Sequence, residues 1–224
     1  RDSTRWLEFR RVLFRSHTTL KKYAARDDLR TFLEIGSSSG GGSTDAFVSG
    51  IKLRHDVTEV RLFCMEVSRI RFKALANHYA AEDFVRCYNI SSIAANELPS
   101  KEEVINFYNS TQTTLNNYPL ETVLDWLRQD VEYIKNSGSD VNGIRLIKQA
   151  NHIQHFDMVL IDGSEFTGER ELYDTTGAKV IALDDVNAFK CWNAYQILLH
   201  TTNYELKEHN FSLRNGYAIF EKKF

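Results

Sequence analysis

The feature that most constrains the fold is a loop of glycine and serine at residues 36–43. An apolar run at 31–35 precedes it, and Thr44 begins a segment that is predicted to be helical. Glycine adopts positive φ without strain, and small residues let the backbone come close to a ligand. A strand, a tight loop and a helix N-terminus with free N–H groups form the opening unit of a nucleotide-binding α/β sheet.

The spacing inside this loop distinguishes between ligands. Gly36 and Gly40 are four residues apart, and Ser38 stands where the dinucleotide-binding motif G-x-G-x-x-G has its second glycine. Glu34 precedes the first glycine, where a carboxylate disfavours a pyrophosphate and suits an ammonium or sulfonium group. We therefore expect a cationic ligand here, and the alternative is a turn without any ligand.

Composition narrows the class of protein. The chain has 224 residues, of which 42% are apolar and 26% charged, as expected for one globular α/β domain. No apolar run has the length of a membrane span, so we expect no membrane association. The formal charge of −2 makes nucleic acid an unfavourable partner. Cys64, Cys87 and Cys191 have neither metal nor disulfide spacing, which predicts a reducing, cytoplasmic environment.

Residues 1–16 stand apart from the rest. Residues 7–16 resemble the in-frame translation of a sequencing-adapter oligonucleotide, so we expect 1–16 to be a non-native segment. The alternative is a basic amphipathic arm that binds nucleic acid or a membrane. Residues 17–224 are then expected to form a single domain.

Apolar runs alternate with amphipathic segments along this domain. Buried strands are predicted at 31–35, 60–66, 84–88, 156–163 and 179–185, with helices between them. Residues 91–150 interrupt the order, because they lack a strong strand and contain helix starts near Ser100 and Pro119. They are expected to form a helical insertion, which is either a substrate-binding cap or additional packing.

Two alternating segments end the chain, at 204–211 and 216–222. They predict two antiparallel strands that turn near Arg214. The expected fold class is therefore α/β: a Rossmann-like, seven-stranded, mostly parallel sheet with a C-terminal antiparallel hairpin and a helical insertion between strands 3 and 4.

Acidic residues end four of the predicted parallel strands. They are Glu34, Glu66, Asp162 and the pair Asp184–Asp185. The carboxyl ends of parallel strands lie along one edge of a sheet, where ligands bind, so we expect these side chains to converge. Clustered carboxylates are unfavourable without a cation, a hydroxyl-rich ligand or a metal ion.

The segments 161–168 and 183–187, together with the loop after Glu34, resemble class I S-adenosylmethionine-dependent methyltransferases, in particular a bacterial subgroup acting on small molecules. The resemblance covers residues 20–224 and is weakest over 91–150. It implies that Glu34 lies near the methionyl amine, Glu66 binds the ribose hydroxyls and residues after the third strand flank the adenine. The cofactor-binding set that it implies is Glu34, Gly36, Ser37, Ser38, Gly40, Glu66, Asn89, Ile90 and Asp162.

The resemblance also implies catalytic groups. Some members of this family hold a divalent cation at positions that match Asp162, Asp184 and Asp185, and all-oxygen ligands favour Mg²⁺. In the alternative, Asp162 only orients the substrate and Asp184 caps the next helix. The expected catalytic residues are Asp162, Asp185 and Lys190, and the general base is left open between Lys190 and Glu165.

The function implied is methyl transfer from S-adenosylmethionine to an oxygen of a small hydroxylated acceptor, such as a sugar or glycan precursor. A homo-oligomer is compatible with it. A nicotinamide-dependent Rossmann oxidoreductase is an alternative, since Glu66 suits a ribose, although the G-x-G-x-x-G motif is missing. A cofactor-binding module without activity, which binds a partner protein through the insertion, is another.

Overall fold

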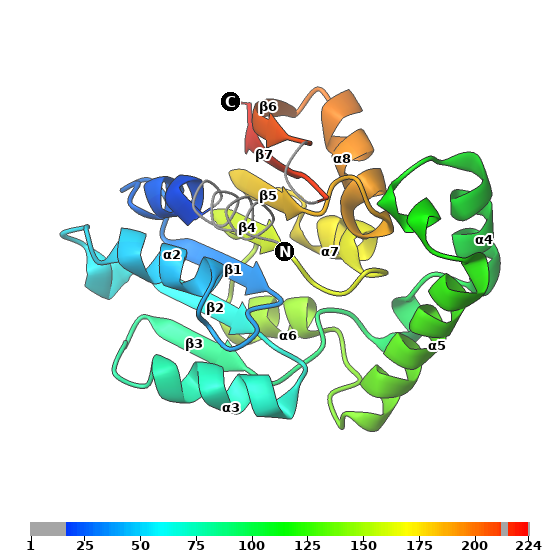
Figure 1. Cartoon of the computed structure of the whole chain (residues 1–224). Helices are drawn as coiled ribbons and strands as arrows, with labels where there is room; N and C mark the ends of the chain where they lie inside the picture. The colour runs from blue at the N-terminus through cyan, green and yellow to red at the C-terminus, as the bar shows by residue number, and fades with distance from the viewer. Residues whose placement is uncertain (1–16, 212–214, 224) are drawn as a thin grey trace, which may run out of the picture.

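A computed structural model describes residues 17–211 and 215–223, and Arg214 and the segment 1–16 lie outside the described residues. Seven strands form one sheet in the order β3-β2-β1-β4-β5-β7-β6 (Figure 1). Neighbours from β3 to β5 are parallel, whereas β7 is antiparallel to both β5 and β6. The predicted fold class is confirmed, including the C-terminal hairpin.

The elements alternate as the sequence predicts. The strands are β1 (Thr31–Ile35), β2 (Arg61–Met65), β3 (Val85–Tyr88), β4 (Met158–Ile161), β5 (Val180–Asp184), β6 (Tyr204–Asn210) and β7 (Tyr217–Lys222). Residues 17–24 are helical. The further helices are α2 (Ser43–Ile51), α3 (Arg69–His78), α4 (Lys101–Ser110), α5 (Leu120–Asn136), α6 (Gly143–Ala150), α7 (Gly168–Thr175) and α8 (Phe189–His200).

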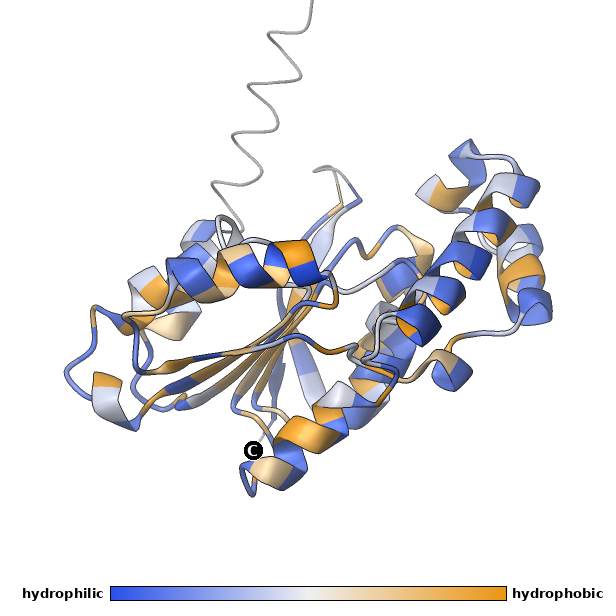
Figure 2. Cartoon of the chain, turned by 90° about the horizontal axis from the view of Figure 1, so that it is seen from below, coloured by the Kyte–Doolittle hydropathy of each residue, from blue (hydrophilic) through white to orange (hydrophobic). Residues whose placement is uncertain are grey.

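Helices cover both faces of the sheet, because successive strand residues point to opposite sides. Leu33 and Ile35 face a core that α6, α7 and α8 close. Phe32 faces a second core, closed by the helix at 17–24 together with α2 and α3. Figure 2 shows the largely apolar strands between these helical layers. None of the helices in the described part is both long and apolar enough to cross a membrane.

The expected insertion at 91–150 divides into two parts. Helix α6 packs on the sheet through Ile144 and Ile147. Helices α4 and α5 instead belong to a separate small core, with members such as Phe107 and Leu127, which Phe166 of the β4–α7 loop also joins. The two helices stand beyond the carboxyl ends of the strands (Figure 1). The 3₁₀ turn at Thr114–Asn117 joins this part to the domain, because the N–H and hydroxyl of Thr114 both donate to the Asn187 carbonyl, at 2.9 and 2.8 Å.

The loop after β1 depends on a close backbone approach at Gly36. Its φ is +85°, and a Cβ added there would lie 1.9 Å from the Asp162 carbonyl oxygen. The Gly36 and Ser37 amides both donate to the Met65 carbonyl, at 3.1 and 3.0 Å. The ends of β1, β2 and β4 are thereby held together at a single residue without a side chain.

We expect Gly36→Ala to lower the free energy of unfolding by at least about 2 kcal/mol, because alanine adds both a left-handed strain and a steric clash. Urea unfolding followed by circular dichroism measures the change. Gly41→Ala is the matched control in the same loop, since an added Cβ at Gly41 meets no atom within 4 Å. Equal losses of stability in the two variants would show that the close contact between Gly36 and the Asp162 carbonyl does not matter for stability.

Candidate functional site

The parallel register places three predicted site residues side by side. Ile35 pairs with Met65 on β2 and with Ile161 on β4, so the three strands end at one level. The residues that follow are Gly36, Glu66 and Asp162. The Asp162 amide donates to the Ile35 carbonyl at 3.2 Å, which continues the ladder one residue beyond β4. The ends of these three strands therefore lie together, with Glu66 and Asp162 next to Gly36.

A cavity of about 220 Å³ opens between these strand ends and helix α5. Its lining residues include Gly36, Ser38, Glu66, Ile90 and Asp162. Five of the residues predicted from the sequence to contact the cofactor therefore line one cavity.

Glu66 is fixed at the wall of this cavity. It is 6% exposed, and the Ser68 amide donates to its Oε1 at 2.7 Å. Asn89, also predicted to contact the cofactor, instead turns its side chain to the backbone, and its Nδ2 donates to the carbonyls of Glu66 and Val67 at 2.8 and 3.0 Å. Asn89 thus ties β3 to the end of β2 and is not among the lining residues, whereas Ile90 is.

Sequence reasoning missed part of the wall. Ser91 and Ser92 follow Ile90 along the cavity, and Asp130 and Tyr133 reach it from α5. The two serines continue the loop after β3, and the polar residues that follow Ile90 in the sequence could have indicated them. The α5 residues carry no sequence signal of this kind, because only the tertiary position of the insertion brings them to the strand ends.

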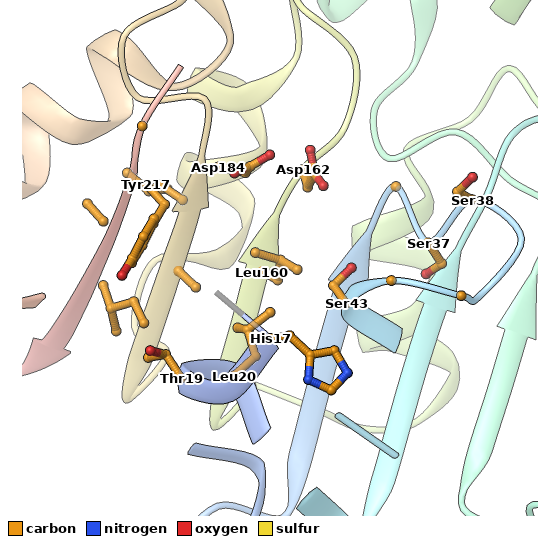
Figure 3. A pocket seen from close by; sticks show the side chains of 18 of the residues that line it. His17, Thr19, Leu20, Ser37, Ser38, Ser43, Leu160, Asp162, Asp184 and Tyr217 are labelled. Atoms are coloured by element: carbon orange, nitrogen blue, oxygen red, sulfur yellow. The ribbon is translucent and has the colours of Figure 1, made fainter. Parts of the chain in front are cut away.

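A second cavity, of about 620 Å³, lies on the other side of the glycine–serine loop (Figure 3). Its wall includes Thr19 of the N-terminal helix, Ser43 at the start of α2, Asp184 at the end of β5 and Tyr217 of β7. The two cavities have three lining residues in common, which are Gly36, Ser38 and Asp162. The two cavities are therefore adjacent at the end of β4.

Two of the predicted cofactor contacts sit in the loop itself. Ser37 is 4% exposed, and within the described part of the chain its hydroxyl has no hydrogen-bond partner. Gly40 has a φ of +88° and packs against Tyr79, whose hydroxyl donates to the Gly40 carbonyl at 2.6 Å. Ser37 thus lines the second cavity with its hydroxyl buried behind the surface, while Gly40 serves to turn the backbone.

Glu34 lies behind the loop. It is fully buried, and its two oxygens accept hydrogen bonds from the hydroxyls of Ser43 and Thr44, the latter at 2.6 Å. Burial raises the pKa of the Glu34 carboxyl, and these two hydroxyls act in the opposite direction. Glu34 is not among the lining residues of either cavity. In the described structure, this carboxyl joins β1 to the start of α2.

The carboxylates of Asp162, Asp184 and Asp185 form a cluster whose candidate ligand atoms all lie within 4.8 Å of one another. Figure 3 shows Asp162 and Asp184 at the neighbouring ends of β4 and β5. The Lys190 ammonium reaches into this cluster, with Nζ 2.8 Å from Asp162 Oδ1 and 2.6 Å from Asp185 Oδ2. The structure therefore brings all the predicted catalytic residues together.

The neighbouring carboxylates determine the protonation state of Lys190. Burial alone would lower the pKa of its amine, but the negative charges of Asp162, Asp185 and Asp184 outweigh burial and raise the pKa well above the ordinary value. Lys190 is therefore a cation at neutral pH, which removes it as a general base.

The oxygen ligands of the cluster suit a hard divalent cation such as Mg²⁺. Two of the three carboxylates already form ion pairs with Lys190. The three carboxylates fit Mg²⁺ by their chemistry. A metal ion would have to share or displace the two ion pairs, so the buried Lys190 ammonium disfavours metal binding at this cluster.

Two further carboxyls near this edge have raised pKa values. Burial raises the pKa of Glu165 to about 7, with the charge of Lys190 acting against it. Burial also raises the pKa of Glu171 to about 7, although the Ser92 hydroxyl donates to Glu171 Oε1 at 2.5 Å. Glu165 keeps the value that suits a general base near neutral pH, but it does not line either cavity.

Comparison with known proteins adds information on the fold. No protein-family model matches the sequence, and no match was found among curated proteins. Solved structures do match. A candidate caffeoyl-CoA O-methyltransferase from Staphylococcus aureus has a TM-score of 0.54 and 13% identity, over 93% of this chain and 83% of that chain. A methyltransferase from Geobacter sulfurreducens has a TM-score of 0.53 and 10% identity, over 93% and 79%.

A third structure carries a ligand. The O-methyltransferase TomG from Streptomyces achromogenes, in complex with S-adenosylmethionine, has a TM-score of 0.50 and 14% identity, over 93% of this chain and 80% of that chain. At these identities the likeness is one of fold. The fold is a Rossmann-like methyltransferase fold, in which antiparallel β7 separates β5 from β6. Dinucleotide-binding sheets have the order 3-2-1-4-5-6 without that strand, so the oxidoreductase alternative loses its structural support.

The raised pKa of Glu171 predicts a pH dependence of stability. Its carboxyl titrates near pH 7 in the folded chain against an ordinary 4.5, so the folded chain binds more protons than the unfolded chain between these values. The free energy of unfolding should therefore fall as pH rises from about 4.5 to about 7. Glu171→Gln should flatten this decline and, at pH 8, recover up to about 3 kcal/mol of stability.

Urea unfolding at a series of pH values measures how the free energy of unfolding changes with pH in the wild-type protein and in Glu171→Gln. Glu121→Gln on the exposed surface of α5 is the control and should keep the wild-type slope. An unchanged slope in Glu171→Gln would show that this carboxyl is ionised in the folded chain.

Proposed function

We propose that the protein is an S-adenosylmethionine-dependent methyltransferase that acts on an oxygen of a small hydroxylated acceptor. The observation that carries the proposal is the pair of cavities that meet at Gly36, Ser38 and Asp162. One cavity has the Glu66 carboxylate, which suits the hydroxyls of a ribose, and the other has Asp162 and Asp184, which suit a hydroxyl acceptor. The similarity in fold to methyltransferases supports this assignment.

The smaller cavity suits the nucleoside part of the cofactor. Glu66 would accept hydrogen bonds from the two ribose hydroxyls, because the Ser68 amide already holds its carboxylate at the wall. Ile90 and the serines after it would flank the adenine. Gly36 and Ser38 would let the chain between nucleoside and methionyl group pass close to the backbone. Glu34 would act as a positioning residue, since it holds the start of α2 behind the loop.

The larger cavity suits the acceptor. Three hydroxyl-bearing residues line it, Thr19, Ser43 and Tyr217, beside the carboxylate of Asp184. Their hydroxyls donate to Glu208 or Glu34, so an acceptor would meet their oxygens as hydrogen-bond acceptors. Apolar side chains of β4 and β5, such as Leu160, complete the wall. Such a mixture of hydrogen-bonding groups and small apolar surfaces suits a compact, hydroxyl-rich molecule, such as a sugar or glycan precursor.

The residues of the chain mainly orient the reactants. When bound, S-adenosylmethionine supplies a methyl group on a cationic sulfur, and the transfer to oxygen leaves the electron pair of the broken bond on sulfur. Asp162 stands at the junction of the cavities, where it would hold the acceptor hydroxyl in line. The hydroxyl proton would pass to the carboxylate of Asp162, which lines both cavities, since Lys190 stays protonated.

Clustered carboxylates beside a reacting hydroxyl favour a nearby positive charge. Mg²⁺ is one candidate source of this charge, since the oxygens of Asp162, Asp184 and Asp185 suit a hard cation and such an ion would act as a Lewis acid on the acceptor oxygen. The Lys190 ammonium is the second source of charge at the same carboxylates.

Cofactor binding tests the proposal directly. Isothermal titration calorimetry should show binding of S-adenosylmethionine and of S-adenosylhomocysteine to the wild-type protein. Glu66→Ala should weaken both, by tenfold to a hundredfold, because hydrogen bonds to a charged group contribute about 1.5–3 kcal/mol. Glu59→Ala, just before the other end of β2, is the matched control and should leave the affinity unchanged. No binding to the wild-type protein would refute the assignment.

Turnover separates binding from chemistry. Release of S-adenosylhomocysteine from pools of hydroxylated small molecules should identify an acceptor. With it, Asp162→Asn should lower kcat by about a hundredfold or more, as loss of a proton acceptor does, while cofactor affinity changes little. Wild-type binding of the cofactor without turnover on any acceptor would instead favour the non-catalytic module.

A further inference from the structure

We propose that the Lys190 ammonium is a built-in replacement for a divalent metal ion at the carboxylate cluster of Asp162, Asp184 and Asp185. The inference rests on the proposed function only for its effect on turnover, because the cation at the cluster can be measured without any reaction. It follows from the position of Lys190, from the way its helix is held and from the atoms that it contacts.

Lys190 forms ion pairs with two carboxylates of the cluster. Lys190 Nζ lies 2.8 Å from Asp162 Oδ1 and 2.6 Å from Asp185 Oδ2, and its side chain is 9% exposed. These two acids belong to the three whose oxygens lie within 4.8 Å of one another. The ammonium therefore sits on the carboxylates that would ligate a metal ion, and repels a second cation there.

The turn between β5 and α8 holds the Asp185 carboxylate close to the Lys190 ammonium. Asp185 has a φ of +55°, in the left-handed region that few residues other than glycine adopt. The following backbone is held by the hairpin, since the Val186 amide donates to Gly216 at 3.2 Å and the Asn187 amide donates to Asn215 at 2.7 Å. The strained residue thus keeps its carboxylate next to the first turn of α8.

The first turn of α8 is itself held in place. A Cβ added at Gly168 would lie 2.0 Å from the Lys190 carbonyl oxygen, so the start of α7 packs directly on this turn. The Cys191 thiol donates to the Ile161 carbonyl at the end of β4, at 3.8 Å. Phe189 contacts Phe107 of the insertion, with ring centroids 4.7 Å apart. Lys190 therefore leaves the cluster only by side-chain rotation, which would break both ion pairs.

A cation attached covalently to the chain has a consequence that a bound ion lacks. A chelator cannot remove it, and no divalent metal is needed to keep the acidic cluster compatible with a reacting hydroxyl. We therefore expect methyl transfer by the wild-type protein to be unaffected by EDTA and unstimulated by Mg²⁺.

The test compares metal binding in the wild-type protein and in Lys190→Met, which keeps an unbranched side chain without the charge. Mn²⁺ is the probe, followed by electron paramagnetic resonance and by calorimetry. The wild-type protein should show no saturable site at millimolar Mn²⁺. Lys190→Met should bind one Mn²⁺ at least tenfold more tightly, and Mn²⁺ should raise its melting temperature but not that of the wild type.

Lys179→Met is the matched control. Lys179 forms an ion pair of 2.8 Å with Asp157 next to the opposite end of β5, so this variant loses the same charge away from the cluster. It should bind Mn²⁺ no better than the wild type. A gain equal to that of Lys190→Met would show a general effect of net charge and would overturn the proposal.

Two other outcomes would also overturn it. One is a saturable Mn²⁺ site in the wild-type protein that Asp185→Asn abolishes, which can be observed even if Lys190→Met does not fold. The other is no gain of Mn²⁺ binding in folded Lys190→Met. Failure of the proposed function is distinct, because it would appear as absent binding of S-adenosylmethionine whatever the metal result.

Discussion

The structure depends on the parallel register by which β1, β2 and β4 end at the same level. Ile35 faces Met65 on one side and Ile161 on the other, and the next residue of β1 is Gly36. A side chain at Gly36 would collide with the carbonyl of Asp162, so the three strand ends approach one another only because this position is glycine. The cavity with Glu66 and the cavity with Asp184 meet there as a result.

Three buried ionisable groups near this edge are stabilised in different ways. Glu34 accepts two hydroxyl hydrogen bonds and thereby anchors the start of α2. Glu171 has a raised pKa and is protonated over part of the physiological range. Lys190 is paired with two carboxylates. Burial of a charge is unfavourable in each case, and the difference lies in whether a hydrogen-bond donor, a proton or an opposite charge compensates for it.

The sequence predicted the fold better than it predicted individual contacts. Apolar runs ending in acids, with amphipathic segments between them, are local patterns, and they correctly predicted the α/β sheet and its terminal hairpin. Glu66 and Ile90 were predicted at the cofactor site, and both line the cavity. Asn89, one residue before Ile90, was also predicted there, but its side chain donates to the backbone carbonyls of Glu66 and Val67 and does not line the cavity. Strand register at the edge of a sheet is set by packing, so a one-residue change cannot be read from composition or periodicity.

By itself the sequence determined the kind of fold, the glycine loop and the set of acids at the strand ends, because hydrophobic period and backbone freedom are properties of short segments. Only the tertiary structure decided that Glu34 faces α2, that α5 contributes Asp130 to a cavity, and that the Lys190 ammonium lies between Asp162 and Asp185. Those facts depend on how helices from distant segments pack on the sheet. Charge pairing over such separations is a result of that packing, and no local pattern encodes it.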